Sequence, residues 1–354
     1  MIIRLFGKRN NLGIGTHYGC FADALHQIWS GTIREVDIEN QSDLQKAAAQ
    51  SQPDDINISF VSMNLEDHFR GHNIQWIVFE STVIPELLLS TLRAAQWVWV
   101  PSTWGRDVLL ANHIDTGKID IVQEGVDPNR FQPCDLRGTR PFRFLTVGKT
   151  EPRKSLVEIM QAFAHTYGQD PTAELVIKTD HFWQAESKRQ TIQQVANSLS
   201  RGIRVEWGNW SQQRMCDLYH DCDVFVFASK GEGWGLPLIE ALAAGMPVLA
   251  THHSAQADYL AHCGSSVMAI DYDMVPVDCE DYRLFYNMHG QDMGEWAQPR
   301  VSSIAQGMRE ARQNYHSLKS QALANSRIIR AGWNWRASAA RALAVLRERG
   351  LLPG

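Results

Sequence analysis

The amino-acid sequence predicts an α/β protein with two domains, each a parallel sheet covered by helices on both faces. Short apolar runs alternate with segments of helical period along most of the chain, which is typical of parallel sheets. The 354 residues exceed what one hydrophobic core usually serves, and this favours two domains. Turn-forming pairs crowd one span of the sequence, namely Asp127-Pro128, Gln132-Pro133 and Arg140-Pro141. We therefore place the domain boundary in this span.

Apolar runs mark the expected strands of the first domain, residues 1–135. We expect these strands at residues 2–6, 56–61, 74–79 and 97–100. Gly13, Gly15 and Gly19 follow the first run and predict a glycine-rich turn. A helix is expected after that turn, over residues 21–29.

A second alternation begins at residue 142, in the domain that spans residues 136–330. We expect its strands at residues 142–147, 175–178, 205–207, 224–228 and 248–250. Residues 156–167 have helical period, with apolar side chains on one face. Residues 274–299 lack periodicity and predict a long loop or insertion. Helical sequence then covers residues 304–329, with a break, and residues 335–349.

Composition and charge exclude several classes of protein. Hydrophobic residues make up 44% and charged residues 21%, which is ordinary globular composition. The net charge of -5 disfavours nucleic acid as the main partner but leaves a local basic patch open. The six cysteines form no Cys-x-x-Cys pair, which favours free thiols in a reducing compartment. No apolar run is long enough for a signal peptide or a membrane span, so we expect a cytoplasmic protein and leave peripheral contact with the inner membrane face open.

The segment from Asp223 to Gly245 carries the most chemical information. A buried strand is followed by a flexible turn at Gly231, Gly233 and Gly235, where backbone can approach a ligand closely. Pro237 suits the first turn of a helix and Gly245 suits its end. A helix N-terminus at the end of a strand is a site for an anion such as a diphosphate.

Two carboxylates accompany this anion site. Glu232 lies in the loop, where it can accept hydrogen bonds from sugar hydroxyls. Glu240 lies inside the helix, where it can accept from a ribose diol, as the acidic residue of dinucleotide folds does.

The same segment resembles the retaining glycosyltransferases of family 4, which have the GT-B architecture. Their signature is two glutamates separated by seven residues around a glycine-rich loop with Phe or Trp, and Glu232-Gly-Trp-Gly-Leu-Pro-Leu-Ile-Glu240 matches it. The full context disfavours the alternative, a strand, turn and helix with two surface glutamates. The resemblance implies a nucleotide-sugar donor, retention of anomeric configuration, no metal and no bound cofactor. It implies donor contacts from Gly233, Trp234, Gly235 and Leu236 as well as the two glutamates.

A second segment, Phe144 to Ser155, resembles the first strand and loop of the family's C-terminal domain. The family usually has Gly-Arg, a short spacer and Lys-Gly, whereas this chain has Gly148-Lys149 and Lys154-Ser155. Cations at a strand end can neutralise a leaving diphosphate, and Lys149 keeps the charge while losing the bidentate fork of arginine. The resemblance implies catalytic roles for Glu232, Lys154 and Lys149 and donor binding by Gly148 and Arg153. The alternative is a surface basic cluster that includes Arg153.

The first domain matches the family less closely. A glycine-rich loop here faces the donor phosphates in the family, so the resemblance implies that Gly13 and Gly15 bind the donor. His17 then contacts the acceptor or the donor sugar, or is an exposed histidine in a tight turn. Glu80 stands where many members carry a histidine, and it either binds the acceptor or closes the strand end.

The resemblance also implies a domain organisation. Residues 1–135 form a Rossmann-like acceptor domain and residues 136–330 a Rossmann-like donor domain, facing each other across a deep cleft. Residues 331–354 form a C-terminal helix that crosses back to the first domain. Asp221-Cys-Asp223 and Asp271-Tyr-Asp273 fit the Asp-x-Asp pattern of metal-dependent enzymes, but an acidic chain produces such pairs by chance, and we assign no metal.

These observations lead to one main hypothesis and several alternatives. The main hypothesis is a retaining transferase that moves a sugar from a nucleotide-diphosphate sugar to a hydroxyl of a glycan or glycolipid. The first alternative is the same chemistry on a protein, a metabolite or a modified nucleic-acid base. The second is a non-catalytic nucleotide-sugar binder, which the departures at Glu80 and Lys149 leave open. The third is an epimerase or a phosphorylase on the same scaffold.

Overall fold

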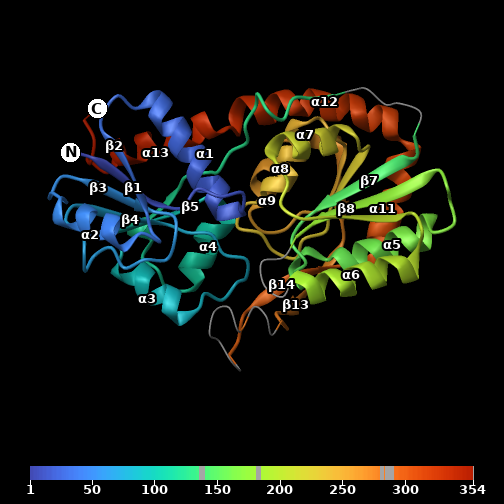
Figure 1. Cartoon of the computed structure of the whole chain (residues 1–354), viewed down its shortest axis with the longest axis horizontal. Coiled ribbons are helices and arrows are strands. Elements are labelled where there is room, and N and C mark those ends of the chain that lie inside the picture. Colours follow the sequence, from blue (N-terminus) through green and yellow to red (C-terminus); the bar gives the residue numbers. More distant parts are fainter. Residues whose placement is uncertain (135–139, 181–184, 280–282, 284–290, 354) are drawn as a thin grey trace. The chain divides into compact units, whose positions relative to one another are not determined.

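The computed structural model describes residues 1–134, 140–180, 185–279, 283 and 291–353 (Figure 1). The chain forms two compact units. The first unit contains Met1–Gly125, Trp333–Gly354 and the described part of Glu280–Gly294. The second unit contains Val126–Cys279 and Glu295–Gly332.

The first unit is built on a six-stranded sheet with the order β2-β1-β3-β4-β5-β6. All of its neighbouring strands are parallel. The strands are β1 (Ile3–Gly7), β2 (Ile33–Asp37), β3 (Ile56–Ser59), β4 (His72–Trp76), β5 (Trp97–Val100) and β6 (Ile119–Ile121). The helices of the unit are α1 (Gly13–Ile28), α2 (Gln41–Ala49), α3 (Glu86–Ala94), α4 (Thr103–Ala111), the 3-10 helix η1 (Thr116–Lys118) and the C-terminal α13 (Trp335–Glu348).

The second unit is built on another six-stranded sheet, with the order β12-β11-β10-β7-β8-β9. Its neighbouring strands are also parallel. The strands are β7 (Phe142–Val147), β8 (Ala173–Thr179), β9 (Ile203–Trp207), β10 (Val224–Phe227), β11 (Val248–Thr251) and β12 (Val267–Ile270). The helices are η2 (Pro152–Lys154), α5 (Leu156–Tyr167), α6 (Ala185–Leu199), α7 (Gln212–His220), α8 (Leu236–Ala243), α9 (Gln256–Leu260), η3 (Gly264–Ser266), α11 (Val301–Gln313) and α12 (Tyr315–Gly332).

Each sheet reverses its strand order once, which confirms the predicted α/β class. In the second sheet the chain adds β8 and β9 on one side of β7 and β10 to β12 on the other. The reversal therefore lies between β7 and β10. Ligands of such sheets bind beyond the carboxyl ends of the strands at this point.

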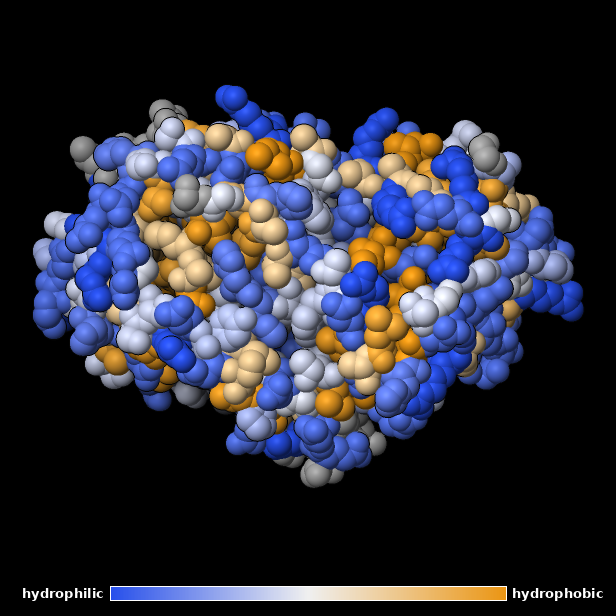
Figure 2. Space-filling model, turned by 180° about the vertical axis from the view of Figure 1, so that it is seen from behind, coloured by the Kyte–Doolittle hydropathy of each residue, from blue (hydrophilic) through white to orange (hydrophobic). Residues whose placement is uncertain are grey.

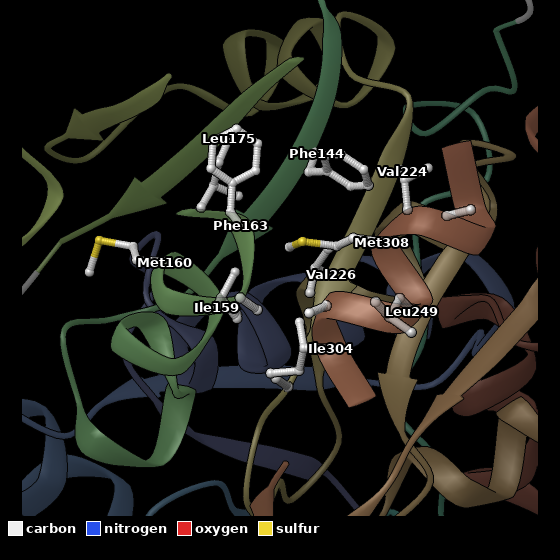
Figure 3. Close-up of a cluster of buried hydrophobic side chains, with 14 of the residues drawn as sticks. Phe144, Ile159, Met160, Phe163, Leu175, Val224, Val226, Leu249, Ile304 and Met308 are labelled. Carbon is white, nitrogen blue, oxygen red and sulfur yellow. The ribbon is translucent and has the colours of Figure 1, made fainter. Parts of the chain in front are cut away.

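The predicted apolar face of α5 forms part of the core of the second unit. Ile159, Met160 and Phe163 of this helix belong to the same buried cluster as Phe144 of β7, and Figure 3 shows these side chains. Met308 of α11 belongs to the same buried cluster. The helices α5 and α11 thus pack with the second sheet in one core. Because α5 is held there, the loop that leads into it is held as well.

The beginning of α1 differs from the prediction. The helix starts at Gly13, so Gly13 and Gly15 lie in its first turn and not in a glycine-rich loop. The absence of a side chain at Gly15 lets Asn10 approach, because a Cβ there would lie 2.2 Å from Asn10 Oδ1. Asn10 in turn accepts a hydrogen bond from the Leu12 N–H group at 2.8 Å. The glycine permits this close contact, and the sequence analysis wrongly interpreted it as a turn former.

The expected long loop at residues 274–299 is also wrong in part. Its two ends pair as an antiparallel hairpin of β13 (Tyr272–Pro276) and β14 (Glu295–Pro299). Trp296 is buried on one face of this hairpin. The prediction missed β2, β6 and β12 as well, which are short strands at the edges of their sheets.

The expected boundary, at residues 135–136, lies outside the described residues, and the two units divide between Gly125 and Val126. The segment from Val126 belongs to the second unit. Its contacts explain why, since Phe131 packs edge-on against Tyr219 and Arg330 Nε donates to the Pro128 carbonyl at 2.9 Å. The chain returns to the first unit at Trp333, where α13 packs against α1.

We expect Phe163→Ala to destabilise the protein by about 3–5 kcal/mol, because the side chain is fully buried and its removal leaves a cavity. Val157→Ala, on the same helix, is the control, since Val157 is 37% exposed and should change stability by less than about 0.5 kcal/mol. Denaturant unfolding followed by circular dichroism measures both. Equal effects of the two substitutions would contradict the packing described for α5.

Candidate active site

The candidate site lies in the second unit, where the order of the sheet reverses. The loop after β7 leads through Gly148 to Ser155, and the loop after β10 leads through Ser229 to Gly235. The two loops are hydrogen-bonded to each other, since the Lys230 N–H group donates to the Arg153 carbonyl at 2.9 Å. Most residues predicted to bind the donor are therefore brought together by neighbouring strands.

The loop after β7 presents Lys154 toward this site. A Cβ on Gly148 would lie 3.2 Å from Cγ of Lys154, so the glycine leaves room for the lysine stem. The short helix η2 ends at Lys154, and Ser155 adopts a left-handed backbone (φ 52°) before α5 begins. The core packing of α5 holds this turn in place.

Glu232 is the centre of a buried charge cluster. Its Oε1 lies 2.5 Å from Lys154 Nζ and 3.0 Å from Arg153 Nη1. The same oxygen accepts a hydrogen bond from Ser229 Oγ at 2.5 Å. The side chains of Glu232, Arg153 and Lys154 are only 6%, 7% and 11% exposed. Arg153 also donates to the Gly231 carbonyl at 2.7 Å, so it fixes both the side chain and the backbone of the glycine-rich loop.

The cluster holds Glu232 in its ionised form. Burial alone would raise the pKa of Glu232, but Lys154, Arg153 and the Ser229 hydroxyl outweigh burial and lower the pKa to about 2. Burial and the neighbouring Arg153 lower the pKa of Lys154, while Glu232 opposes this shift. The site therefore contains a permanent carboxylate at neutral pH.

Lys149 stands apart from the cluster. Its side chain is 45% exposed and its Nζ lies 3.6 Å from Glu151. Glu151 also lies 3.1 Å from Arg153. In this arrangement Arg153 is the second cation on Glu232, and Lys149 adds charge at the surface of the loop. The three cations and two carboxylates named here leave one net positive charge.

The glycine-rich loop ends at the N-terminus of α8. Gly235 has φ 93°, a conformation that glycine adopts without strain. Trp234 is buried, with its ring edge-on to Tyr259 at 5.1 Å between centroids. Trp234 is thus packed within the unit, and Leu236 begins the helix beside it.

Glu240 lies on α8 and has a different electrostatic environment from Glu232. Burial raises the pKa of Glu240 to about 7, although a hydrogen bond from Tyr219 and the charge of Arg130 oppose this shift. The Tyr219 hydroxyl donates to Glu240 Oε2 at 2.8 Å. Sequence analysis missed Tyr219, because nothing in the sequence around α7 distinguishes it from an ordinary core aromatic residue.

The two residues predicted for the acceptor side lie in the first unit. His17 is 3% exposed, and its ring packs edge-on against Phe60 and Trp76 and is stacked on Trp335. Burial lowers the pKa of His17 to about 3. The alternative of an exposed histidine in a tight turn is therefore wrong, and acceptor contact stays a prediction. Glu80 is half-buried at a bend that follows β4.

The two Asp-x-Asp pairs, to which no metal was assigned, contain aspartates that pair with arginines. Asp223 accepts hydrogen bonds from Arg140 Nη1 at 2.7 Å and from the Arg143 N–H group at 2.8 Å. Asp273 pairs with Arg300. Within the described part of the chain, no group of three or more His, Cys, Asp or Glu residues is arranged to hold a metal ion.

Comparison with known proteins finds a family model that is similar to this region. Residues 135–272 match the family model described as glycosyl transferases group 1. The match covers less than half of the chain and lies in the part that contains the second sheet. The match contains Lys154, Glu232 and Glu240, and with them the whole charge cluster.

Curated relatives resemble part of the chain. D-inositol 3-phosphate glycosyltransferase of Rhodococcus opacus is 28% identical over 149 residues, or 39% of this chain and 33% of the relative. Serotype-specific mannosyltransferase WbdA of Escherichia coli is 31% identical over 107 residues, or 30% of this chain and 13% of the relative. The alignments thus span a third or less of these two relatives' length.

Solved structures resemble the chain over its full length and show the fold. HepE of Anabaena, solved with UDP and glucose, has a TM-score of 0.74 at 10% identity, covering 98% of this chain and 99% of HepE. Sucrose-phosphate synthase of Thermosynechococcus elongatus has a TM-score of 0.73 at 16% identity, covering 99% of each chain. The predicted GT-B class, with two Rossmann-like domains, is confirmed.

Among the described residues, no helix is both long and apolar enough to cross a bilayer. The face shown in Figure 2 is largely hydrophilic, with hydrophobic residues in separate patches. The most exposed large apolar side chain of the described residues is Leu87, at the beginning of α3.

We expect Lys154→Met to lower stability at neutral pH, because Glu232 would keep only one buried cation. The loss should stay below the ~3–5 kcal/mol of removing a sole partner, since Arg153 remains. Stabilisation from a carboxylate with a lowered pKa is present above its ordinary pKa of 4.5 and is lost as pH falls through about 2. In the variant the pKa of Glu232 in the folded state rises, so the loss should be smaller and should be complete at higher pH.

Thermal unfolding between pH 2 and 7 measures this effect, with Lys149→Met as the matched control. Lys149 is exposed and its ion pair with Glu151 is long, so its removal should leave the stability profile close to that of the wild type. If the two variants had the same profile, the buried cluster would not have the energetic role described here.

Proposed function

We propose that this protein transfers a sugar from a nucleotide-diphosphate sugar to a hydroxyl group of an acceptor, with retention of anomeric configuration. The observation that carries the proposal is the buried cluster of Glu232, Lys154 and Arg153 at the sheet reversal, inside the segment that matches the family model. The group 1 match and the UDP and glucose bound by HepE support a nucleotide sugar as the donor.

The donor diphosphate lies, in this proposal, at the N-terminus of α8 beside Lys154. Free N–H groups at a helix N-terminus favour an anion, and the cations stabilise the charge that grows on the leaving phosphate. Gly148, Gly233 and Gly235 allow the backbone to approach the ligand closely. Glu240 accepts hydrogen bonds from the ribose diol.

Glu232 binds the sugar that is transferred. Its Oε1 is engaged by Lys154, Arg153 and Ser229. None of the described residues donates a hydrogen bond to its Oε2, so this second oxygen is available to a sugar hydroxyl. A carboxylate that remains ionised is a strong acceptor for such a bond.

The transfer itself is proposed to proceed without a metal. The sugar–phosphate bond breaks while the acceptor oxygen bonds to the anomeric carbon on the same face, and the leaving phosphate takes the acceptor proton. Lys154 and Arg153 supply the positive charge. Retention implies that product and donor have the same anomeric configuration, which proton NMR of the first-formed product measures.

The acceptor is proposed to be a glycan or glycolipid. Relatives support this choice by name, among them WbdA and a GDP-mannose:cellobiosyl-diphosphopolyprenol alpha-mannosyltransferase of Xanthomonas campestris. Because these matches cover only part of each relative, the acceptor rests on analogy. A glycolipid acceptor would bring a cytoplasmic protein to the inner membrane face.

One donor should bind and raise the melting temperature in a screen of UDP-, GDP-, ADP- and CMP-sugars. A ligand that binds only the folded state stabilises it by about 2.7 kcal/mol at a hundred times its Kd. Glu232→Gln and Lys154→Met should weaken the shift, whereas Lys46→Met should retain it, because Lys46 lies on α2 of the first unit and is 69% exposed. Donor hydrolysis and transfer assays with the same panel then measure turnover.

Donor binding without hydrolysis or transfer to any acceptor would instead indicate a non-catalytic nucleotide-sugar binder. If no nucleotide sugar binds, or if the two site variants respond as the wild type does, the proposed donor site is wrong.

Donor affinity should rise with pH through about 7, because the ionised form of Glu240 is the better acceptor for ribose hydroxyls and its pKa is raised to about 7. Tyr219→Phe removes a hydrogen bond that holds this pKa down, so the midpoint should move to higher pH. Tyr167→Phe is the control, since its hydroxyl bonds the Met308 carbonyl. Calorimetric titration of the donor between pH 5.5 and 8.5 measures the three profiles, and identical midpoints would contradict the role of Tyr219.

A further inference from the structure

The end of β11 and the segment after it hold the backbone of the glycine-rich loop through side chains. Thr251 Oγ1 donates to the Ser229 carbonyl at 2.6 Å. Tyr259 of α9 donates through its hydroxyl to the Trp234 carbonyl at 3.0 Å. Between these two anchors, Ser254 Oγ accepts the Glu232 N–H group at 2.9 Å. The position of the Glu232 backbone is therefore held by a segment about twenty residues further along the chain.

The bonds of the Ser254 hydroxyl are fixed by its neighbour Gln256. The Gln256 side-chain Nε2 donates to the Thr251 carbonyl at 3.2 Å, which turns Oε1 of the same amide toward Ser254 at 2.9 Å. An amide oxygen only accepts, so the Ser254 hydroxyl donates its proton on that side. The His253 carbonyl, 2.7 Å away, is a second acceptor for the same proton. The lone pairs of Oγ are thereby directed to the Glu232 N–H group.

Ser254 makes these bonds from an unfavourable backbone conformation. Its φ is 60°, and only His113 and Ser155 share a positive φ among the described residues other than glycine. A non-glycine residue persists in this region when its surroundings hold it there. Ser254 is 3% and Gln256 0% exposed, so a surface role does not account for either side chain.

We propose that Ser254, oriented by Gln256, is a positioning residue that aims the Glu232 carboxylate at the transferred sugar. The inference rests on the proposed function, because it assigns Glu232 to the sugar and not to the diphosphate. Ser254 touches neither ligand in this proposal and acts only through the backbone of Glu232. The residues proposed to bind the nucleotide are held by other contacts. The stem of Lys154 packs against Gly148, and Glu240 accepts a hydrogen bond from Tyr219.

Because Ser254 acts on Glu232 and not on the nucleotide-binding residues, its loss should change kcat more than the affinity for the nucleoside diphosphate. Loss of the hydroxyl leaves a buried N–H group without its acceptor, so the backbone at Glu232 shifts to find another. A displacement of about 1 Å at a reacting centre lowers a rate by up to about a hundredfold. Affinity for the free nucleoside diphosphate should change little, because that ligand lacks the sugar.

The test compares Ser254→Ala, Ser254→Gly and Ser200→Ala. Ser200 is the matched control, since its Oγ also accepts a backbone N–H group, from Gly202 at 3.0 Å, and donates to a carbonyl, of Gly168 at 3.0 Å. It lies before β9, at the opposite edge of the same sheet. For each variant we would measure the melting temperature, kcat for the identified donor and the Kd of its nucleoside diphosphate.

We expect Ser254→Ala to lower kcat about ten- to a hundredfold, with the nucleoside diphosphate Kd within about twofold of the wild type. Ser254→Gly should melt at a higher temperature than Ser254→Ala, because glycine relieves the positive φ, and should have an equally low kcat. Ser200→Ala should lower the melting temperature and leave kcat unchanged.

The inference is overturned if kcat of Ser254→Ala equals that of the wild type, or if Ser254→Gly restores kcat together with stability. It is overturned as well if the Kd of the nucleoside diphosphate weakens in parallel with kcat, since Ser254 would then support the whole loop. A wild-type protein that neither hydrolyses nor transfers any nucleotide sugar would reject the proposed function itself, and this outcome differs from each of the others.

Discussion

The loops after β7 and β10 depend on one constraint, which is that the buried carboxylate of Glu232 needs cations beside it. An ion removed from water costs several kcal/mol unless opposite charges compensate it, and Glu232 is only 6% exposed. Its two cations come from the loop after β7, whereas Glu232 itself comes from the loop after β10. The pairing therefore connects the two loops that flank the reversal of the sheet.

The same pairing determines how an anionic ligand can be received. Lys154 and Arg153 already compensate Glu232, and with Lys149 and Glu151 the loop keeps one net positive charge. In the proposed donor complex, the diphosphate adds negative charge beside these cations and stabilises them without displacing the carboxylate. Glu232 can then use its second oxygen for a hydroxyl group of the ligand, so the ion pair and the ligand reinforce each other.

The sequence was sufficient for features that are local or periodic. The buried stripe of α5 follows from helical spacing, and the strand–turn–helix around Glu232 follows from the order of apolar residues, glycines and Pro237. The start of α1 was mispredicted because Gly15 serves the side chain of Asn10, a contact that composition does not indicate. Tyr219 and Ser254 were missed for a similar reason, since each acts on a glutamate about twenty residues away through one hydrogen bond.

Backbone strain is concentrated around the charge cluster, and this argues that the cluster is more than a structural ion pair. Three non-glycine residues of the described chain have positive φ. His113 has an ordinary explanation, because it follows the end of α4 and the Ile114 N–H group bonds back to the Leu109 carbonyl. Ser155 instead follows Lys154 directly, and Ser254 bonds the backbone of Glu232. Strained residues persist where the surrounding structure holds them and are enriched at ligand sites, so two such residues beside one ion pair support the proposed function of this cluster.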